Sequence, residues 1–305
     1  MKPTGSSSHV VTRRHQAGGS SARSLLMTVL GEFVLPTGAP VWTQTLVEVL
    51  GLLGVEEKSA RQSLARTAAD GWLASDRDGR RVRWSLTDSG QRLLTEGAQR
   101  IYGFGTHRNG WDGQWLVLAV TVPELQRRLR HRLRTRLAWA GLGSPAAGLW
   151  VTPDASKEPE VAQVVAEQGL TGSAFCYVGR FGSIGEPQTV VAQAWDLARV
   201  EKGYEQFVAD VEAAASTTPA EVFVTQLRLV HAWRRFPFVD PQLPTELLPA
   251  QWAGVRAADV FRRRHAEWEP AARRQWASLA GLDPATAEVR SHTDGGRRNR
   301  LASGP

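Results

Sequence analysis

The change of hydrophobic period between residues 72 and 86 constrains the fold of this chain more than any other feature. Before it, apolar side chains recur at helical spacing, as they do within residues 24–34. From residue 72 onward apolar and polar residues alternate, and Asp78-Gly79 divides the stretch into two arms. A dipeptide of this kind closes tight hairpins. Three helices followed by a hairpin predict a winged helix-turn-helix domain over residues 23–104.

The helices of this domain can be placed from their apolar stripes. Three are expected before the hairpin, at residues 24–34, 43–53 and 56–70, and a fourth after it, at residues 87–101. A short turn at Gly54 joins the second helix to the third, as a helix-turn-helix requires.

The outer face of the third helix has the composition of a DNA-reading surface. When Leu64 is placed toward the core on a helical wheel, the opposite face and its flanks carry hydrogen-bond donors and hydroxyl groups but no acidic side chain. Arginine, lysine and glutamine read base edges in the major groove, whereas serine binds phosphates. The residues expected to contact DNA are Lys58, Ser59, Arg61, Gln62, Ser63 and Arg66. The alternative is a solvated helix face without a ligand.

Basic side chains also gather at the tip of the hairpin. The expected DNA contacts there are Arg77, Arg80, Arg81 and Arg83. Wing arginines of this kind bind the DNA backbone or enter the minor groove. From Lys58 to Arg83 the chain carries seven cations and three acids. The two ends, residues 1–23 and 290–305, account for the whole formal charge of +7, so the residues between them are neutral overall. A local surplus of cations within this neutral part is therefore informative.

Alternating strands and helices predict a second domain over residues 113–196. Residues 115–122 are apolar throughout, which is typical of a strand buried on both faces. The further elements are expected as a helix at 124–141, a strand at 148–152, a helix at 159–169, a strand at 173–180 and a fourth strand at 189–195. This order predicts a small ferredoxin-like α/β sandwich. The helix at 124–141 carries six arginines, which are either solvated or form a second phosphate-binding surface for DNA or a small anion.

A third, helical domain is expected over residues 197–281. Pro219 stands near the start of a helix to residue 235, and another helix is expected at 253–268. The segment FPFVDPQLP between them must be extended because of its three prolines. The fold class is therefore a multidomain α+β protein. Polar, basic tails at residues 1–22 and 282–305 are expected to be disordered and flexible.

The sequence lacks the motifs of common enzyme classes. No GxxxxGK[ST], GxSxG or HExxH pattern occurs, so we expect no catalytic residue, metal or cofactor. His265 and Glu269 are expected to form a solvated pair, and the single cysteine, Cys176, to fill a small core position. The lack of a long apolar run, of a signal peptide and of cysteine pairs predicts a cytoplasmic protein without membrane contact.

Two parts of the chain resemble the PaaX family of transcriptional repressors. Its winged-helix half is similar to three stretches of the N-terminal region, which are SLLMTVLGEFV, EKSARQSLARTAADGWL and the basic hairpin. LVHAWRRFPFVDPQLPTELLPAQWAG, at residues 229–254, looks like its C-terminal signature, and the resemblance covers about residues 22–270. It implies a homodimeric repressor of aromatic, phenylacetate-type catabolic genes that leaves its operator when an aryl-CoA thioester such as phenylacetyl-CoA binds.

The resemblance also bears on single residues. It implies a Cas2-like middle domain, but Thr121-Val122-Pro123 stands where such nucleases carry a catalytic Asp at the end of the first strand, so nuclease activity is not expected. Arg61 falls where the family places an arginine that contacts DNA.

The segment HAWRRFPF suits an effector site. The arginines fit the phosphates of coenzyme A, and the aromatic rings fit an aryl group. The expected effector-binding residues are Trp233, Arg234, Arg235, Phe236 and Phe238. The alternative is a rigid domain or dimer clamp with the arginines paired to acids such as Asp240.

Two alternatives remain for the function. One is an enzyme acting on a CoA ester or nucleotide, with the winged helix as an interaction module. The other is a DNA-binding activator, which the sequence does not distinguish from a repressor.

Overall fold

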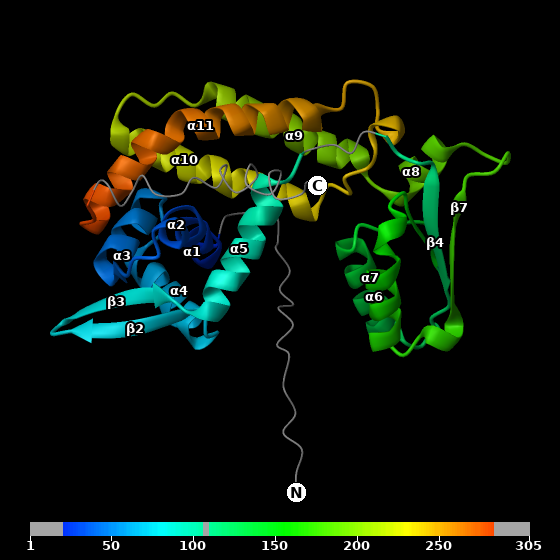
Figure 1. Cartoon of the computed structure of the whole chain (residues 1–305), viewed down its shortest axis with the longest axis horizontal. Coiled ribbons are helices and arrows are strands. Elements are labelled where there is room, and N and C mark those ends of the chain that lie inside the picture. The colour runs from blue at the N-terminus through cyan, green and yellow to red at the C-terminus, as the bar shows by residue number, and fades with distance from the viewer. Residues whose placement is uncertain (1–20, 106–109, 284–305) are drawn as a thin grey trace, which may run out of the picture.

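The computed structural model describes residues 21–105 and 110–283. Its elements form an N-terminal unit (residues 22–102), a central domain (114–194) and a layer of C-terminal helices (197–280). Figure 1 shows the N-terminal unit beneath the C-terminal helices and the central domain at one end of these helices, both extending to the same side. The C-terminal helices therefore join the two other parts.

The N-terminal unit begins with a helix that changes its winding. Its helices are α1 (Ala22–Val29), continued by the π-helical turn η1 (Leu30–Val34) and α2 (Leu35–Thr37), then α3 (Thr43–Leu52) and α4 (Glu57–Ala69). Helix α1 starts two residues before the expected position because the Ser21 hydroxyl accepts a hydrogen bond from the Ser24 amide. Ser21 and Ala22 are thus part of the fold, whereas the rest of the expected N-terminal tail, residues 1–20, lies outside the described residues.

A three-stranded sheet and a long helix complete this unit. Strands β2 (Leu73–Asp78) and β3 (Arg81–Leu86) form an antiparallel hairpin, and β1 (Val41–Trp42) pairs with β3. Asp78 pairs with Arg81, so the loop is Gly79-Arg80, one residue later than expected. Of the two loop residues only Gly79 has a positive φ, 59°, so this turn needs a single glycine. Helix α5 (Asp88–Tyr102) follows, capped by Thr87 as expected.

The core of the N-terminal unit includes side chains from the other end of the chain. Leu26 of α1 and Leu64 of α4 are fully buried in it. Phe223, Leu227 and Trp276 belong to the same cluster and come from two C-terminal helices. Movement of these helices relative to the N-terminal unit would therefore disturb a shared apolar core.

The central domain is an antiparallel sheet with two helices on one face. Its elements are β4 (Gln114–Val120), α6 (Arg127–Trp139), β5 (Gly143–Ala146), β6 (Leu149–Thr152), α7 (Glu158–Glu167) and β7 (Ala174–Arg180). The strand order β5-β6-β4-β7 and the β-α-β-β-α-β sequence are those of a ferredoxin-like arrangement. Leu116 and Leu118 of β4 pack against Leu133 of α6 and Val161 of α7 in one buried cluster.

Two expectations for the central domain are wrong. The stretch expected as a strand at 189–195 is helix α8 (Pro187–Ala194), because Pro187 in the first turn presets the helical φ angle. The fourth strand is β5, whose Gly and Pro residues resemble a chain break in the sequence. Cys176 is exposed rather than buried, since β7 is an edge strand.

The C-terminal layer consists of α9 (Leu197–Ala213), α10 (Pro219–Trp233) and α11 (Ala253–Ala280). Thr218 and Glu221 form a capping box at the start of α10. The proline-rich segment after α10 is not fully extended, because it forms the short 3-10 helices η4 (Phe236–Phe238) and η5 (Thr245–Leu247). Helix α11 continues past its expected end, through Pro270, because its last turns pack Trp276 into the core of the N-terminal unit.

Candidate DNA interface and ligand cleft

Helix α4 has one buried face and one open face. Ala60, Leu64 and Thr67 are buried against α1 and α3. The exposed residues among the expected DNA contacts are Lys58, Arg61, Gln62 and Arg66, and Ser59 is half-buried. The open face thus presents three cations and an amide on a helix whose position is fixed by its buried side.

Ser63 does not belong to this face. Its side chain is buried, at 6% exposure, and its hydroxyl donates a hydrogen bond to the carbonyl oxygen of Ser59 over 2.8 Å. On the helical wheel Ser63 lies on a flank, and the packing of α1 and α3 on α4 covers that flank. The expectation that Ser63 contacts DNA is therefore corrected by the structure.

Arg61 has a local partner. Its Nε lies 2.8 Å from Oε1 of Glu57, one turn earlier, and the side chains of both residues are more than half exposed, at 51% and 65%. Exposed pairs of this kind contribute about 0.3–0.5 kcal/mol, so the arginine can exchange this carboxylate for another acceptor at small cost.

The four arginines of the hairpin fall into two groups. Two of them have partners within the sheet. Arg83 pairs across the strands with Asp76, with Nη2 and Oδ2 2.6 Å apart, and the guanidinium of Arg81 lies 4.1 Å from the ring centre of Trp42. These contacts stiffen the hairpin. The other two, Arg77 and Arg80, are exposed, and neither forms an ion pair with another residue in the described ranges. The hairpin therefore offers two available cations close to its turn.

A cavity of about 1760 Å³ lies between the central domain and the C-terminal segment at residues 237–249. The C-terminal end of α5 closes another side, so all three parts of the chain contribute to it. Its aromatic lining includes Trp139, Trp150, Trp195 and Phe238, and its cations are Arg100, Arg134 and Lys157. Ligand pockets usually measure about 300–1000 Å³, so this cleft has room for an unusually large ligand.

The structure separates the five expected effector residues. Trp233 and Phe236 are buried in the core, where Phe236 stacks on Tyr204 with ring centres 4.1 Å apart and the Trp233 indole donates to the carbonyl oxygen of Ile101. Arg235 is exposed beside Phe236 and donates to the carbonyl oxygen of Gly203. Only the exposed Phe238 lines the cleft.

Arg234 connects the effector segment to the N-terminal unit. Its Nη1 donates to the carbonyl oxygen of Ser24 over 2.7 Å and to the hydroxyl of Thr28 over 2.9 Å, both on α1. Burial lowers the pKa of Arg234, but a guanidinium remains charged in a protein. Arg234 thus holds α10 to α1 as a clamp between domains would, but through a carbonyl and a hydroxyl oxygen rather than through an acid such as Asp240, which accepts a hydrogen bond from Tyr204.

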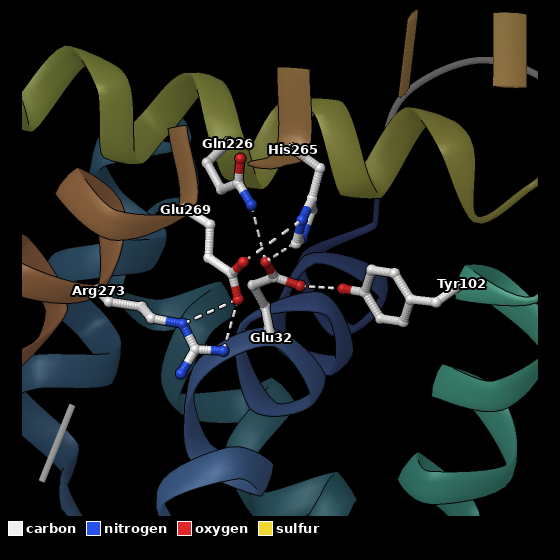
Figure 2. A network of polar contacts seen from close by, with 6 residues as sticks. All are labelled: Glu32, Tyr102, Gln226, His265, Glu269 and Arg273. Atoms are coloured by element: carbon white, nitrogen blue, oxygen red, sulfur yellow. Dashed lines mark hydrogen bonds and ion pairs between the residues drawn. The ribbon is translucent and has the colours of Figure 1, made fainter. Parts of the chain in front are cut away.

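A buried polar network joins the same two parts of the chain. Figure 2 shows Glu32 of η1 surrounded by Tyr102 of α5, Gln226 of α10 and His265 of α11. One oxygen of Glu32 accepts from Gln226 Nε2 over 2.9 Å and lies 2.8 Å from His265 Nε2, and the other accepts from the Tyr102 hydroxyl. Buried charges persist in a fold when they are paired and hydrogen-bonded in this way.

The pKa values in the network follow from these contacts. Burial by itself would raise the pKa of Glu32, but the charge and hydrogen bond of His265, with the bonds from Tyr102 and Gln226, lower it to about 2. Burial would lower the pKa of His265, and the charges of Glu32 and Glu269 raise it instead. Burial and the charge of Glu32 together raise the pKa of Tyr102. Both shifts favour the charged forms of Glu32 and His265, as expected for a buried ion pair.

This network was not predicted from the sequence. His265 and Glu269 were expected to form a solvated pair, whereas the side chain of His265 is 4% and that of Glu269 13% exposed, and Glu269 pairs with Arg273. The available signal was Glu32 itself, because a carboxylate in the middle of a buried apolar run requires a buried partner. Within residues 21–105 and 110–283, no cluster of three or more His, Cys, Asp or Glu side chains is arranged to hold a metal ion.

Comparison with known proteins assigns the family. Three family models match in succession: the PaaX-like protein model at residues 21–90, the central Cas2-like domain of the PaaX protein at 108–191 and the PaaX-like C-terminal domain at 195–278. The chain is also 32% identical to the transcriptional repressor PaaX of Escherichia coli strain K12 over 263 residues, which cover 83% of this chain and 82% of that protein. The chain belongs to the PaaX family.

The family assignment confirms the resemblance noted in the sequence and the Cas2-like central domain. The E. coli relative is a transcriptional repressor, which is a regulator and not an enzyme, in agreement with the expectation for this PaaX-family chain. A solved structure of an uncharacterized protein from Mycobacterium tuberculosis has the same fold, with a TM-score of 0.58 and 24% identity over 87% of this chain and all of that one. Among the helices that the structure describes, none is both long and apolar enough to cross a bilayer.

Proposed function

We propose that this chain is a DNA-binding transcriptional repressor and that its N-terminal unit is a winged helix-turn-helix, with α4 as recognition helix and the β2–β3 hairpin as wing. The single observation that carries this proposal is that one unit contains both the open, basic face of α4 and the two available cations of the hairpin. A helix of this width fits the major groove of B-DNA, and arginine and glutamine on its outer face can read base edges. The E. coli relative is a transcriptional repressor, which supports the same conclusion.

The test measures affinity for a duplex taken from the region upstream of the chain's own gene, by fluorescence anisotropy. Arg61→Ala should weaken binding to the specific site by about 1–3 kcal/mol and leave binding to unrelated duplex less affected. Arg80→Ala should weaken all duplexes alike, because a wing arginine contacts the backbone. Arg262→Ala serves as control, since this exposed arginine of α11 pairs with Asp259 on the C-terminal layer. Equal affinities of wild type and Arg61→Ala would refute the role of α4.

We further propose that an aryl-CoA thioester, such as phenylacetyl-CoA, binds in the cleft and releases the DNA. The aromatic rings of the cleft suit an aryl group, and Arg100 and Arg134 suit the phosphates of coenzyme A, whereas Lys157 pairs with Glu160 of the same lining. Of the five residues expected from the sequence, Phe238 is the one proposed to touch the ligand directly. Trp233 and Phe236 would anchor the segment that carries it.

The path from the cleft to the DNA-binding unit is short. Residues 237–242 line the cleft, and Arg234, three residues before this segment, is bonded to α1. A ligand that favours another position of the segment would therefore change the contact with α1, which packs against α4. This gives the effector a physical means to alter the placement of the recognition helix.

Titration of phenylacetyl-CoA into the protein–DNA complex tests the effector proposal. We expect release of the duplex, with coenzyme A alone and phenylacetate alone as controls that lack one half of the ligand. Phe238→Ala should raise the concentration needed for release without changing the affinity for DNA. Release that is unaffected by Phe238→Ala and Arg100→Ala would place the effector elsewhere, and no release would remove this ligand class.

We propose that the repressor acts as a homodimer in the cytoplasm. Dimers with two-fold symmetry suit inverted-repeat operators. The sheet face of the central domain opposite α6 and α7 exposes two aromatic side chains, Phe175 and Tyr177, each 64% exposed. Exposed aromatic pairs on a sheet face are typical of association surfaces, and this face is our candidate for the dimer contact.

A further inference from the structure

Helix α6 carries a concentration of positive charge, of which the proposed function uses Arg134 alone. Between Arg127 and Trp139 the helix has six arginines and no acid. Leu133 and Leu137 bury its inner side against the sheet, so the helix is firmly attached to the central domain. The exposed arginines are Arg127, Arg128, Arg130, Arg132 and Arg134.

The arginines of α6 lie on two flanks with different surroundings. On the flank toward α7, Arg136 pairs with Glu167 and Arg132 donates to the amide oxygen of Gln168. On the other flank, Arg127, Arg130 and Arg134 succeed one another at helical spacing, and we call them the arginine stripe. In the part of the chain that the structure describes, no member of the stripe forms an ion pair with an acid.

The arginine stripe begins at the cleft and leads away from it. Arg134 lines the cleft, whereas Arg127 and Arg130 do not. Seven helical residues advance about 10 Å, so a small ligand in the cleft that reaches Arg134 would leave Arg127 without a partner. A polyanion is needed to neutralise the whole stripe, and three nucleotides of one strand of a duplex advance by about the same 10 Å.

The stripe is placed where bound DNA can reach it. Figure 1 shows that the central domain with α6 and the N-terminal unit with α4 and the hairpin extend to the same side of the C-terminal helices. An operator longer than the site read by α4 would continue past the N-terminal unit on that side. Lysine and arginine contacts with its backbone would add affinity without adding sequence preference.

We propose that the arginine stripe of α6 is a second DNA contact, which binds the phosphate backbone of double-stranded DNA flanking the site read by α4. This inference rests on the proposed DNA-binding function and extends it from the N-terminal unit to the central domain. The repressor then holds its operator at two places on each chain, one specific and one electrostatic.

The test compares two double variants of α6 that change the charge equally. Arg127→Ala with Arg130→Ala removes two members of the stripe, and Arg128→Ala with Arg132→Ala removes two charges from the flank toward α7. Each pair also removes one hydrogen bond within the domain, from Arg130 to Pro123 or from Arg132 to Gln168, so the structural cost is matched. Arg134 is left intact because it lines the cleft.

A footprint on the upstream region first defines the segment that the protein protects. One duplex is trimmed to this protected segment. The other extends it on each side by about 10 base pairs, which is one helical turn. Affinity is measured from 50 to 200 mM salt. Loss of two phosphate contacts should reduce the magnitude of the slope of log affinity against log salt concentration by about 1.8. We expect this change for the stripe variant on the extended duplex only. Arg127→Lys with Arg130→Lys should restore most of the slope, because lysine keeps the charge.

The outcomes separate this inference from the proposed function. If both alanine pairs flatten the slope equally, or neither does, the arginine stripe is not a DNA contact, even when Arg80→Ala weakens binding. If wild type shows no affinity for either duplex, or if Arg61→Ala and Arg80→Ala leave affinity unchanged, the proposed function itself fails. Far-ultraviolet circular dichroism of each variant verifies that α6 still folds.

Discussion

The buried carboxylate of Glu32 allows the most specific stability prediction. Glu32→Gln keeps the size of the side chain and removes the charge that His265, Tyr102 and Gln226 surround. The difference between a pKa of about 2 and the ordinary value of 4.5 corresponds to about 3 kcal/mol near neutral pH. Breaking a buried ion pair costs about 3–5 kcal/mol, which is consistent. We therefore expect the free energy of unfolding to fall by about 3 kcal/mol.

The size of this loss depends on pH in a direction set by two groups. The pKa of Glu32 is lowered by folding, so its stabilisation is complete above 4.5 and is lost as the pH falls from there toward about 2. The pKa of His265 is raised by folding, so its contribution is complete below 6.5 and is lost as the pH rises through the raised value. Wild type and Glu32→Gln should differ most between pH 4.5 and 6.5.

Urea unfolding followed by tryptophan fluorescence at pH 5.5 and pH 8.5 measures this difference. Thermal unfolding should show a loss of roughly 5 °C in Tm, because the entropy of unfolding is about 2.1 cal/mol/K per residue. Glu48→Gln on α3 is the matched control, because Glu48 is exposed and its replacement should change the stability by less than about 0.5 kcal/mol. If Glu32→Gln behaves like Glu48→Gln at pH 5.5, the ionised pair does not stabilise the fold and the reasoning is refuted.

Three further predictions concern α4, the packing of α5 and the dimer. Glu57→Gln frees the arginine paired with it on α4, so DNA affinity in anisotropy should rise about twofold, and a decrease would contradict the pairing. Gly90→Ala would place a Cβ 2.2 Å from the carbonyl oxygen of Trp72, so chemical unfolding should show a loss of about 3 kcal/mol, and a neutral result would contradict that packing. Phe175→Ser with Tyr177→Ser should convert the proposed dimer to monomers in light scattering, and an unchanged mass would exclude this sheet face.

Local signals in the sequence were sufficient for much of the fold. The hairpin, the helix capped by Thr87 and the start of α10 at Pro219 were all placed to within a residue or two, because a turn, a cap or a proline acts on its own neighbours. The exposed cations of α4 and of the β2–β3 hairpin also followed from the helical wheel and strand alternation.

Contacts between distant segments explain the errors. Helix α11 continues through Pro270, which a local rule treats as a stop, because the turns after it bury Trp276 among residues of the N-terminal unit. Ser63 is covered by packing that a wheel does not contain. Glu32 and His265 are separated by 233 positions, so neither shows its partner locally. The cleft likewise arises from three parts of the chain and has no single sequence motif.

Site-directed cross-linking tests most directly whether the open face of α4 enters the DNA groove. A Cys176→Ser background removes the single native cysteine, and Gln62→Cys places a new thiol at the middle of that face. Gln206→Cys, at an exposed position of α9, is the control. With duplexes that carry a thiol-reactive base at successive positions, Gln62→Cys should cross-link to a few adjacent bases inside the footprint, and Gln206→Cys to none. Cross-linking from Gln62→Cys no stronger than from Gln206→Cys, on DNA that the protein still binds, would contradict the assignment of α4 as the recognition helix.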